Sequence, residues 1–221
     1  MKKYYGDEIL DDFTEFSTAD ATVFIDPLDG TKDFTNGNLT AVSILIGLAI
    51  NGVPKIGIVH HPFKETENNG VGFTIFATQE HGAFKLEYND QMSQEELKNR
   101  KPEYITPYNI DEELKSDFKI RYGSSLTHQT PEMSAASIRL VPCKMVKLGG
   151  AGNKVNRIAL GETDAYIQPA KGPSLWDLCG PEPIIRALGG LITDWDHKRF
   201  VYDEKKNGGT KCRAFFIGKT P

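Results

Sequence analysis

The pair Asn51-Gly52 joins two apolar segments of the chain, residues 39–50 and 53–60. Asparagine and glycine both tolerate positive φ angles, so this pair between apolar runs is a strong signal for a β-hairpin. Residues 22–26 form another short run rich in β-branched residues, which is typical of a buried strand. We therefore predict that the first half of the chain is β-rich and largely antiparallel.

The second half of the chain alternates between strand-like and helix-like segments. A glycine-opened helix is predicted over residues 150–160, and a second helix over 181–188, which ends at Gly189-Gly190 as helices commonly do. Strands are predicted at residues 118–122, 143–148, 163–168, 191–195 and 213–217. This pattern predicts layered helices and sheets in one domain of two lobes, a β-rich lobe over residues 1–117 and an α/β lobe over 118–221.

Composition excludes several classes of protein. Lysine and arginine number 26 and aspartate and glutamate 30, so the net charge is 26 − 30 = −4, which argues against a nucleic-acid coat or a membrane-surface protein. The three cysteines include no C-x-x-C pair, which favours a reducing compartment. The longest apolar stretch is shorter than the roughly 20 residues that span a bilayer. We expect a soluble, cytoplasmic protein without nucleic-acid or membrane partners.

The sequence IDPLDGT, residues 25–31, is the first motif with chemical content. A buried strand ends in Asp26, and a second carboxylate, Asp29, follows three residues later. Gly30 permits a tight turn, which can direct both carboxylates and the Leu28 carbonyl at one point. These hard oxygen ligands suit Mg²⁺, and free N–H groups near Thr31, at the start of a short helix, favour phosphate. The alternative interpretation is an ordinary turn rich in aspartate.

Haloacid-dehalogenase-type phosphatases offer a rival interpretation of the same residues. They also end a strand with two aspartates followed by Gly-Thr, and the first aspartate is their nucleophile. One residue separates their aspartates, whereas Pro27 and Leu28 separate the pair here. The spacing therefore points away from an aspartyl-phosphate route.

Two further motifs lie in the second half. GGAGNK, residues 149–154, opens a predicted helix; such starts bind phosphate through backbone N–H groups, and Lys154 adds positive charge, although many serve packing alone. In WDLCGPE, residues 176–182, Asp177 precedes a helix with Pro181 in its first turn. Asp177 is either a helix cap or a further metal ligand.

The three motifs, in this order, resemble the inositol-monophosphatase-like superfamily of Mg²⁺-dependent, lithium-sensitive phosphatases, and most closely its 3′(2′),5′-bisphosphate nucleotidases. The similarity covers roughly residues 22 to 218. It implies a layered αβαβα sandwich. It also implies a hydrolase that removes the 3′-phosphate of adenosine 3′,5′-bisphosphate, or the 1-phosphate of a related inositol polyphosphate, with a metal-activated water.

The resemblance also implies roles for individual residues. Two or more Mg²⁺ ions would be held by Asp26, the Leu28 carbonyl, Asp29 and Asp177. Thr31 would contact the phosphate and help to activate the attacking water, so Thr31, Asp26 and Asp29 form the catalytic set. The residues implied in substrate binding are Gly30, Thr31, Ser124, Gly150 and Lys154. Ser124 lies in GSSLT, where the family usually has Thr-Arg-Ser-His, and this departure weakens its assignment.

The front of the chain departs further from the family. Its members carry about a hundred residues before the first motif, including a helical pair, an aspartate that polarises the threonine, and a Gly-Glu-Glu-type metal ligand. This chain has 25 residues before Asp26, and Gly6-Asp7-Glu8 is the candidate substitute. We expect a truncated sandwich without the N-terminal helices. The alternative function is therefore a catalytically weak protein of the same fold that binds phosphorylated ligands.

Other side chains that attract attention are expected to be structural. His60-His61 ends a strand, but no further ligand follows at metal-binding spacing. Cys179 lies near Asp177 without a group that would activate its thiol, so we predict a packing role. Glu95-Glu96 is predicted to be solvated helix charge.

Overall fold

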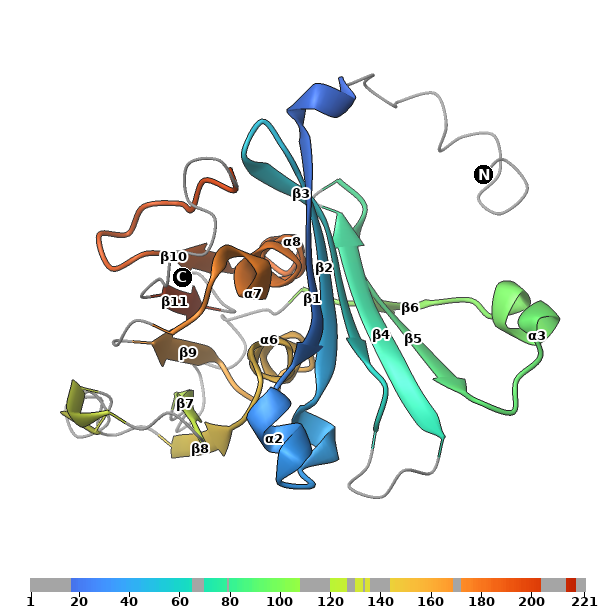
Figure 1. Cartoon of the computed structure of the whole chain (residues 1–221), viewed down its shortest axis with the longest axis horizontal. Helices are drawn as coiled ribbons and strands as arrows, with labels where there is room; N and C mark the ends of the chain where they lie inside the picture. The colour runs from blue at the N-terminus through green and yellow to red at the C-terminus, as the bar shows by residue number, and fades with distance from the viewer. Residues whose placement is uncertain are drawn as a thin grey trace.

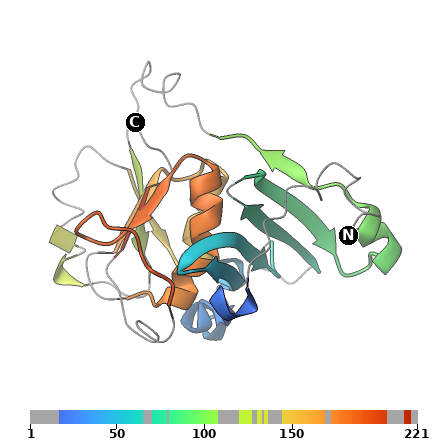
Figure 2. The ribbon, with the colours of Figure 1, turned by 90° about the horizontal axis from the view of Figure 1, so that it is seen from above.

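The computed structural model describes residues 17–64, 70–78, 80–107, 120–126, 130–132, 134–135, 144–168, 172–203 and 214–217. These residues form two β-sheets with helices between them (Figures 1 and 2). Asp7 and Glu8, the candidate substitutes for an N-terminal ligand, lie outside the described residues.

The first sheet has six strands that pair in sequence order, each antiparallel to the next. Its strands are β1 (Ala21–Asp29), β2 (Ser43–Ile50), β3 (Val53–His61), β4 (Val71–Thr78), β5 (Gly82–Asn89) and β6 (Glu103–Ile105). The predicted hairpin between β2 and β3 is confirmed, and Asn51 and Gly52 have φ angles of 51° and 75°.

Two predictions about this region are wrong. The strand predicted over residues 39–50 begins only at Ser43, because α2 (Thr31–Thr35) and the 3₁₀ turn η3 (Leu39–Ala41) are used to reverse the chain between β1 and its antiparallel neighbour. Residues 101–117 are predicted to be a loop from their sequence, which contains Pro102 and Pro107, but this segment includes β6, which pairs with β5 and extends the sheet by one short strand. The helix α3 (Gln94–Asn99) connects these two strands.

The inner face of the first sheet packs against helices. Along β2, Leu45 and Ala49 are fully buried, whereas the alternate residues Ile44, Ile46 and Leu48 are partly exposed, as the two-residue period of a strand requires. The inner residues join a core with α6 (Ala151–Ala159), α7 (Leu175–Cys179) and α8 (Pro181–Ala187). This helix layer holds the GGAGNK and WDLCGPE motifs of the second half of the chain against the first sheet.

The outer face of the first sheet is apolar but open. Val23 and Ile25 of β1 are each 56% exposed and Ile56 of β3 is 39% exposed. The described helices α6, α7 and α8 all lie on the other side of the sheet (Figures 1 and 2). The described residues therefore contain the inner β, α and β layers of the predicted sandwich.

The second sheet has the strand order β10-β11-β9-β7-β8. Its strands are β7 (Arg121–Ser125), β8 (Lys144–Leu148), β9 (Ala165–Gln168), β10 (Leu191–Thr193) and β11 (Ala214–Ile217). β7 runs parallel to β8 and β9, and the other pairs are antiparallel. The lobe boundary near residue 118 lies outside the described residues, and the division into two lobes stays a prediction. Within the described ranges, no helix combines the length and apolar character needed to cross a bilayer.

Candidate metal centre

A bulge at the end of β1 places two aspartates on the same face of the sheet. Asp26 pairs with Leu45 and Asp29 pairs with Ser43, so three steps along β1 oppose two steps along β2. Without the extra residue, side chains three positions apart would point to opposite faces. Pro27 lies inside the bulge, where its missing N–H leaves no ladder bond unmade. Both carboxylates therefore face the helix layer.

Asp177 reaches the same place from a distant part of the chain. It lies on α7, which packs against β1 and β2. Carboxylate oxygens of Asp26, Asp29 and Asp177 all lie within 4.8 Å of one another. The structure thus brings together the three acidic side chains that the motifs singled out, and their oxygens form a donor set suited to Mg²⁺.

Asp29 is buried and strongly bound by its neighbours. Its Oδ1 accepts a hydrogen bond from the Ala151 N–H at 2.9 Å, and its Oδ2 accepts from the Gly152 N–H at 2.8 Å and from the Ser43 hydroxyl at 2.7 Å. Burial raises the pKa of the Asp29 carboxyl, whereas these hydrogen bonds and the charge of Lys154 act in the opposite direction. The GGAGNK motif therefore delivers N–H groups to Asp29, a role that the sequence did not suggest.

Asp26, Leu28 and Thr31 form the more open side of the cluster. The Leu28 N–H donates to Asp26 Oδ1 at 3.1 Å, and the Thr31 hydroxyl donates to the Leu28 carbonyl at 2.9 Å. Thr31 is exposed at the start of α2. Because its proton is directed at a carbonyl, its oxygen keeps lone pairs that can accept a hydrogen bond from a water.

Asp177 also contributes to local structure. Its Oδ2 accepts a hydrogen bond from the Ser174 N–H at 2.5 Å, at the start of α7. Asp177 therefore does not cap the helix that holds Pro181, and this interpretation is wrong: it lies inside α7, where Ser174 is the N-cap. The other interpretation, a member of an acidic cluster, agrees with the structure. Trp176, the preceding residue, is 36% exposed.

Lys154 lies beneath the carboxylates rather than on the surface. It is 9% exposed, its Nζ donates to the Tyr166 hydroxyl at 3.2 Å, and Nζ is 4.3 Å from the centroid of that ring. The Tyr166 hydroxyl donates in turn to Gln168. Burial lowers the pKa of the Lys154 ammonium to about 8, against the opposing charges of Asp29, Asp33 and Asp177. Its predicted contact with a substrate stays a prediction.

Among the other residues predicted to bind substrate, Gly30 and Gly150 serve a visible structural purpose. Gly30 and Gly150 both have positive φ angles, and a Cβ atom on either would lie within 2.8 Å of the Ala41 carbonyl oxygen. Ser124 is fully buried in β7, and its hydroxyl has no hydrogen-bond partner among the described residues. A substrate role for these three residues stays a prediction.

The two neighbouring histidines occupy structural positions. His60 contacts the hydroxyl groups of Thr74 and Tyr88, and His61 is buried and stacks on Phe73 with ring centroids 4.9 Å apart. Burial lowers the pKa of His61 to about 3. Neither histidine belongs to a metal-suited cluster in the part of the chain that the structure describes.

Ser43 is a residue of the site that none of the sequence motifs includes. It is fully buried within the apolar run of β2, and its hydroxyl contacts Asp29. The available signal was its register: Ser43 shares the inward face with Leu45 and Ala49, and a hydroxyl on a core-facing position needs a partner.

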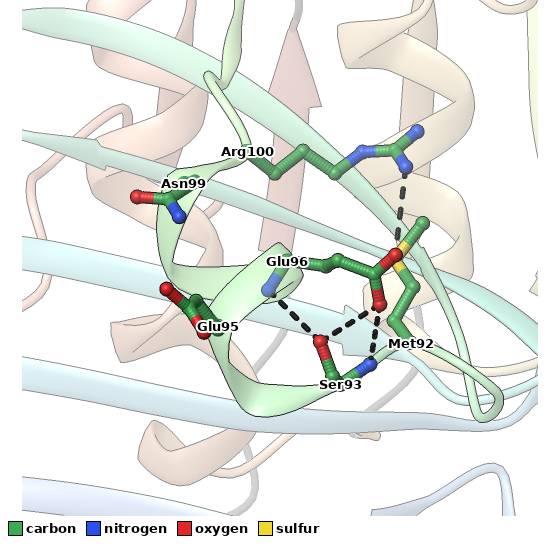
Figure 3. A pocket seen from close by; sticks show the side chains of 6 residues that line it. All are labelled: Met92, Ser93, Glu95, Glu96, Asn99 and Arg100. Atoms are coloured by element: carbon green, nitrogen blue, oxygen red, sulfur yellow. Dashed lines mark hydrogen bonds between the residues drawn. The ribbon is translucent and has the colours of Figure 1, made fainter.

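Figure 3 shows a hollow beside α3. It is lined by Met92, Ser93, Glu95, Glu96, Asn99 and Arg100. Its hydrogen bonds between Ser93 and Glu96 cap the helix, because the Ser93 hydroxyl accepts from the Glu96 N–H while the Glu96 carboxylate accepts from the Ser93 N–H. The helix follows β5 near one edge of the first sheet, whereas Asp26 and Asp29 end β1 at the other edge. This hollow carries no comparable set of ligands.

Comparison with known proteins agrees with the motifs and the fold. The model of the inositol monophosphatase family matches residues 2–212. The chain is 30% identical to 3'(2'),5'-bisphosphate nucleotidase 1 of Dictyostelium discoideum over 211 residues, which cover 90% of this chain and 61% of that protein. The chain therefore belongs to the inositol monophosphatase family, and it spans about three fifths of this relative's length. The dehalogenase interpretation finds no support.

Solved structures show the same fold at lower identity. CysQ from Bacteroides thetaiotaomicron superposes with a TM-score of 0.69 at 21% identity, covering 93% of this chain and 74% of that one. The staphylococcal SaIMPase-II with bound 2'AMP gives a TM-score of 0.63 at 18% identity, covering 90% and 64%. These similarities establish the inositol monophosphatase fold for this chain.

Proposed function

We propose that this chain is a Mg²⁺-dependent phosphomonoesterase that hydrolyses the 3′-phosphate of adenosine 3′,5′-bisphosphate or the 1-phosphate of a related inositol polyphosphate. The observation that carries the proposal is the approach of three carboxylates, from β1 and from α7, to within 4.8 Å of one another. Family membership and the similarity to a bisphosphate nucleotidase support the choice of reaction and substrate.

The donor set fits divalent cations. Asp26, Asp29, Asp177 and the Leu28 carbonyl offer only oxygen ligands, which match Mg²⁺ better than zinc. Three carboxylates so close together repel one another and gain most from a counter-ion of double charge. Two or more Mg²⁺ held there would supply Lewis-acid stabilisation of the negative charge on a phosphate monoester.

The chain's own groups complete the proposed site. Thr31 directs its proton at the Leu28 carbonyl, which leaves lone pairs on its oxygen. In the proposed mechanism this oxygen accepts a hydrogen bond from the attacking water and so orients it. The buried Lys154 ammonium adds positive charge beneath the carboxylates, and this charge favours an anionic substrate.

The test is phosphate release by the purified chain with Mg²⁺ and adenosine 3′,5′-bisphosphate. Asp177→Asn should reduce the rate by more than the roughly 10–100-fold that loss of an outer metal-site partner costs, with an unchanged circular dichroism spectrum. Asp20→Asn is the matched control, because Asp20 is exposed ahead of β1 and outside the cluster. Wild-type turnover by Asp177→Asn would refute the metal assignment. Ligand binding without turnover by the wild-type chain would favour the catalytically weak alternative.

A further inference from the structure

Asp29 is held by three donors from two different elements. Ser43 of β2 donates its hydroxyl at 2.7 Å, and the first turn of α6 donates two backbone N–H groups, from Ala151 at 2.9 Å and Gly152 at 2.8 Å. Two of these three bonds, those from Ser43 and Gly152, end on Oδ2. An ionised carboxylate offers about four acceptor positions. Three donors therefore leave about one acceptor position on Asp29 for a cation, and they fix the direction in which that position points.

Ser43 is enclosed at the point where three segments meet. It is fully buried, and it lies opposite Asp29 in the β1–β2 register. A Cβ atom on Gly152 would lie 2.3 Å from the Ser43 oxygen, so the first turn of α6 approaches this hydroxyl too closely to leave room for a side chain. Such enclosure restricts the orientation of the hydroxyl, which donates its hydrogen bond to Asp29 Oδ2.

We infer that Ser43 is a positioning residue for the cation site. The two N–H groups of α6 alone would leave the Asp29 carboxylate freer to rotate, and the Ser43 hydroxyl fixes its orientation. Ser43 itself is not a ligand. The inference rests on the proposed function, since it concerns the same carboxylate cluster, but it adds a residue that lies outside the three motifs. Loss of partners that orient metal ligands typically weakens metal affinity by about 10–100-fold.

The experiment measures Mg²⁺ affinity directly, so that it does not depend on turnover. Tb³⁺ luminescence sensitised by Trp176, the neighbour of Asp177, reports occupancy of the site, and competition with Mg²⁺ gives the dissociation constant. Ser43→Ala should raise the Mg²⁺ dissociation constant about tenfold. Phosphate release at saturating Mg²⁺ should change much less, which gives a split between cation affinity and turnover that a purely structural role would not produce.

Two further variants separate positioning from packing. Thr163→Val also removes a buried hydroxyl, one without a hydrogen-bond partner among the described residues, and should leave Mg²⁺ affinity unchanged. Ser43→Cys keeps a donor at this position, although a weaker one, and should bind Mg²⁺ less tightly than wild type, so it tests the inference if Ser43→Ala fails to fold. Equal Mg²⁺ affinities of wild type and a folded Ser43 variant would overturn this inference alone. A wild-type chain that binds no Mg²⁺ would overturn the proposed function and this inference together.

Discussion

Replacing Gly150 with alanine should lower the free energy of unfolding far more than the same replacement at Gly189. Gly150 precedes α6 with φ 62° and ψ 144°, a conformation that is essentially restricted to glycine and that costs other residues about 1–3 kcal/mol. A Cβ atom there would also lie 2.2 Å from the Ala41 carbonyl oxygen and 3.1 Å from Asp29 Oδ2. Overlap of this kind forces backbone shifts that cost about 1–3 kcal/mol more. We expect Gly150→Ala to lower the free energy of unfolding by about 4 kcal/mol, the sum of these two contributions.

Gly189 separates these two contributions. It also has a positive φ angle, +83°, but a Cβ atom there would meet nothing within 4 Å. Gly189→Ala should therefore cost only the backbone contribution, about 1–2 kcal/mol. The free energy of unfolding is measured by urea titration with far-ultraviolet circular dichroism, and both variants should keep the wild-type m-value.

The two glycine variants should also differ in their effect on the proposed cation site. Moving the first turn of α6 away from Ala41 also moves the Ala151 and Gly152 N–H groups that bind Asp29. Gly150→Ala should therefore weaken Mg²⁺ binding, whereas Gly189→Ala should not. Equal losses of stability in the two variants would show that α6 does not press against the Ala41 carbonyl, and the close-approach reasoning would be wrong.

Two further predictions concern pH and the open sheet face. Burial holds the pKa of His61 at about 3 in the folded chain, whereas an unfolded histidine has a pKa of about 6.5. Between these pH values the unfolded chain binds a proton that the folded chain does not. The stability present above pH 6.5 is therefore lost as the pH falls toward 3. The loss between pH 7 and 5 should be about 2 kcal/mol smaller in His61→Leu than in wild type, and urea titrations giving the same loss for both would contradict the assignment. Ile25, 56% exposed, should tolerate Ile25→Thr at a cost below about 0.5 kcal/mol, whereas Ile75→Thr, at a fully buried position of β4, should cost about 2–4 kcal/mol. A cost above about 2 kcal/mol at Ile25 would mean that the outer face is covered in solution.

The sequence was sufficient to find the acidic cluster because each of its aspartates lies in a short, recognisable motif. Asp26 and Asp29 are recognisable from their place at a strand end beside Gly30, and Asp177 from its place at a helix start. What the motifs could not give is the β1 bulge, since a strand's register depends on its partner. That bulge decides whether two aspartates three residues apart face the same way.

The sequence was least informative where a residue's purpose depends on tertiary contact. Ser43 resembles a chance interruption of an apolar strand, yet it binds Asp29. The sequence predicts a substrate contact for Lys154, which stays a prediction, but it does not indicate that the ammonium is buried against Tyr166. In both cases the partner is more than ten residues away in the chain, and neither local propensity nor periodicity records such a pairing.

The position of Asp177 depends on glycines that carry no chemistry themselves. Where α7 meets α8, the chain lies against the first sheet so closely that a Cβ atom on Gly47 would be 2.4 Å from the Cys179 carbonyl carbon, and one on Gly57 would be 2.0 Å from the Gly180 oxygen. A larger residue at Gly47 or Gly57 would hold the α7–α8 junction away from the sheet, and Asp177 with it. On the other side of the cluster, Gly150 and Gly152 allow α6 the same approach to Asp29. The distances between the three carboxylates are therefore set by backbone packing, which these four glycines permit.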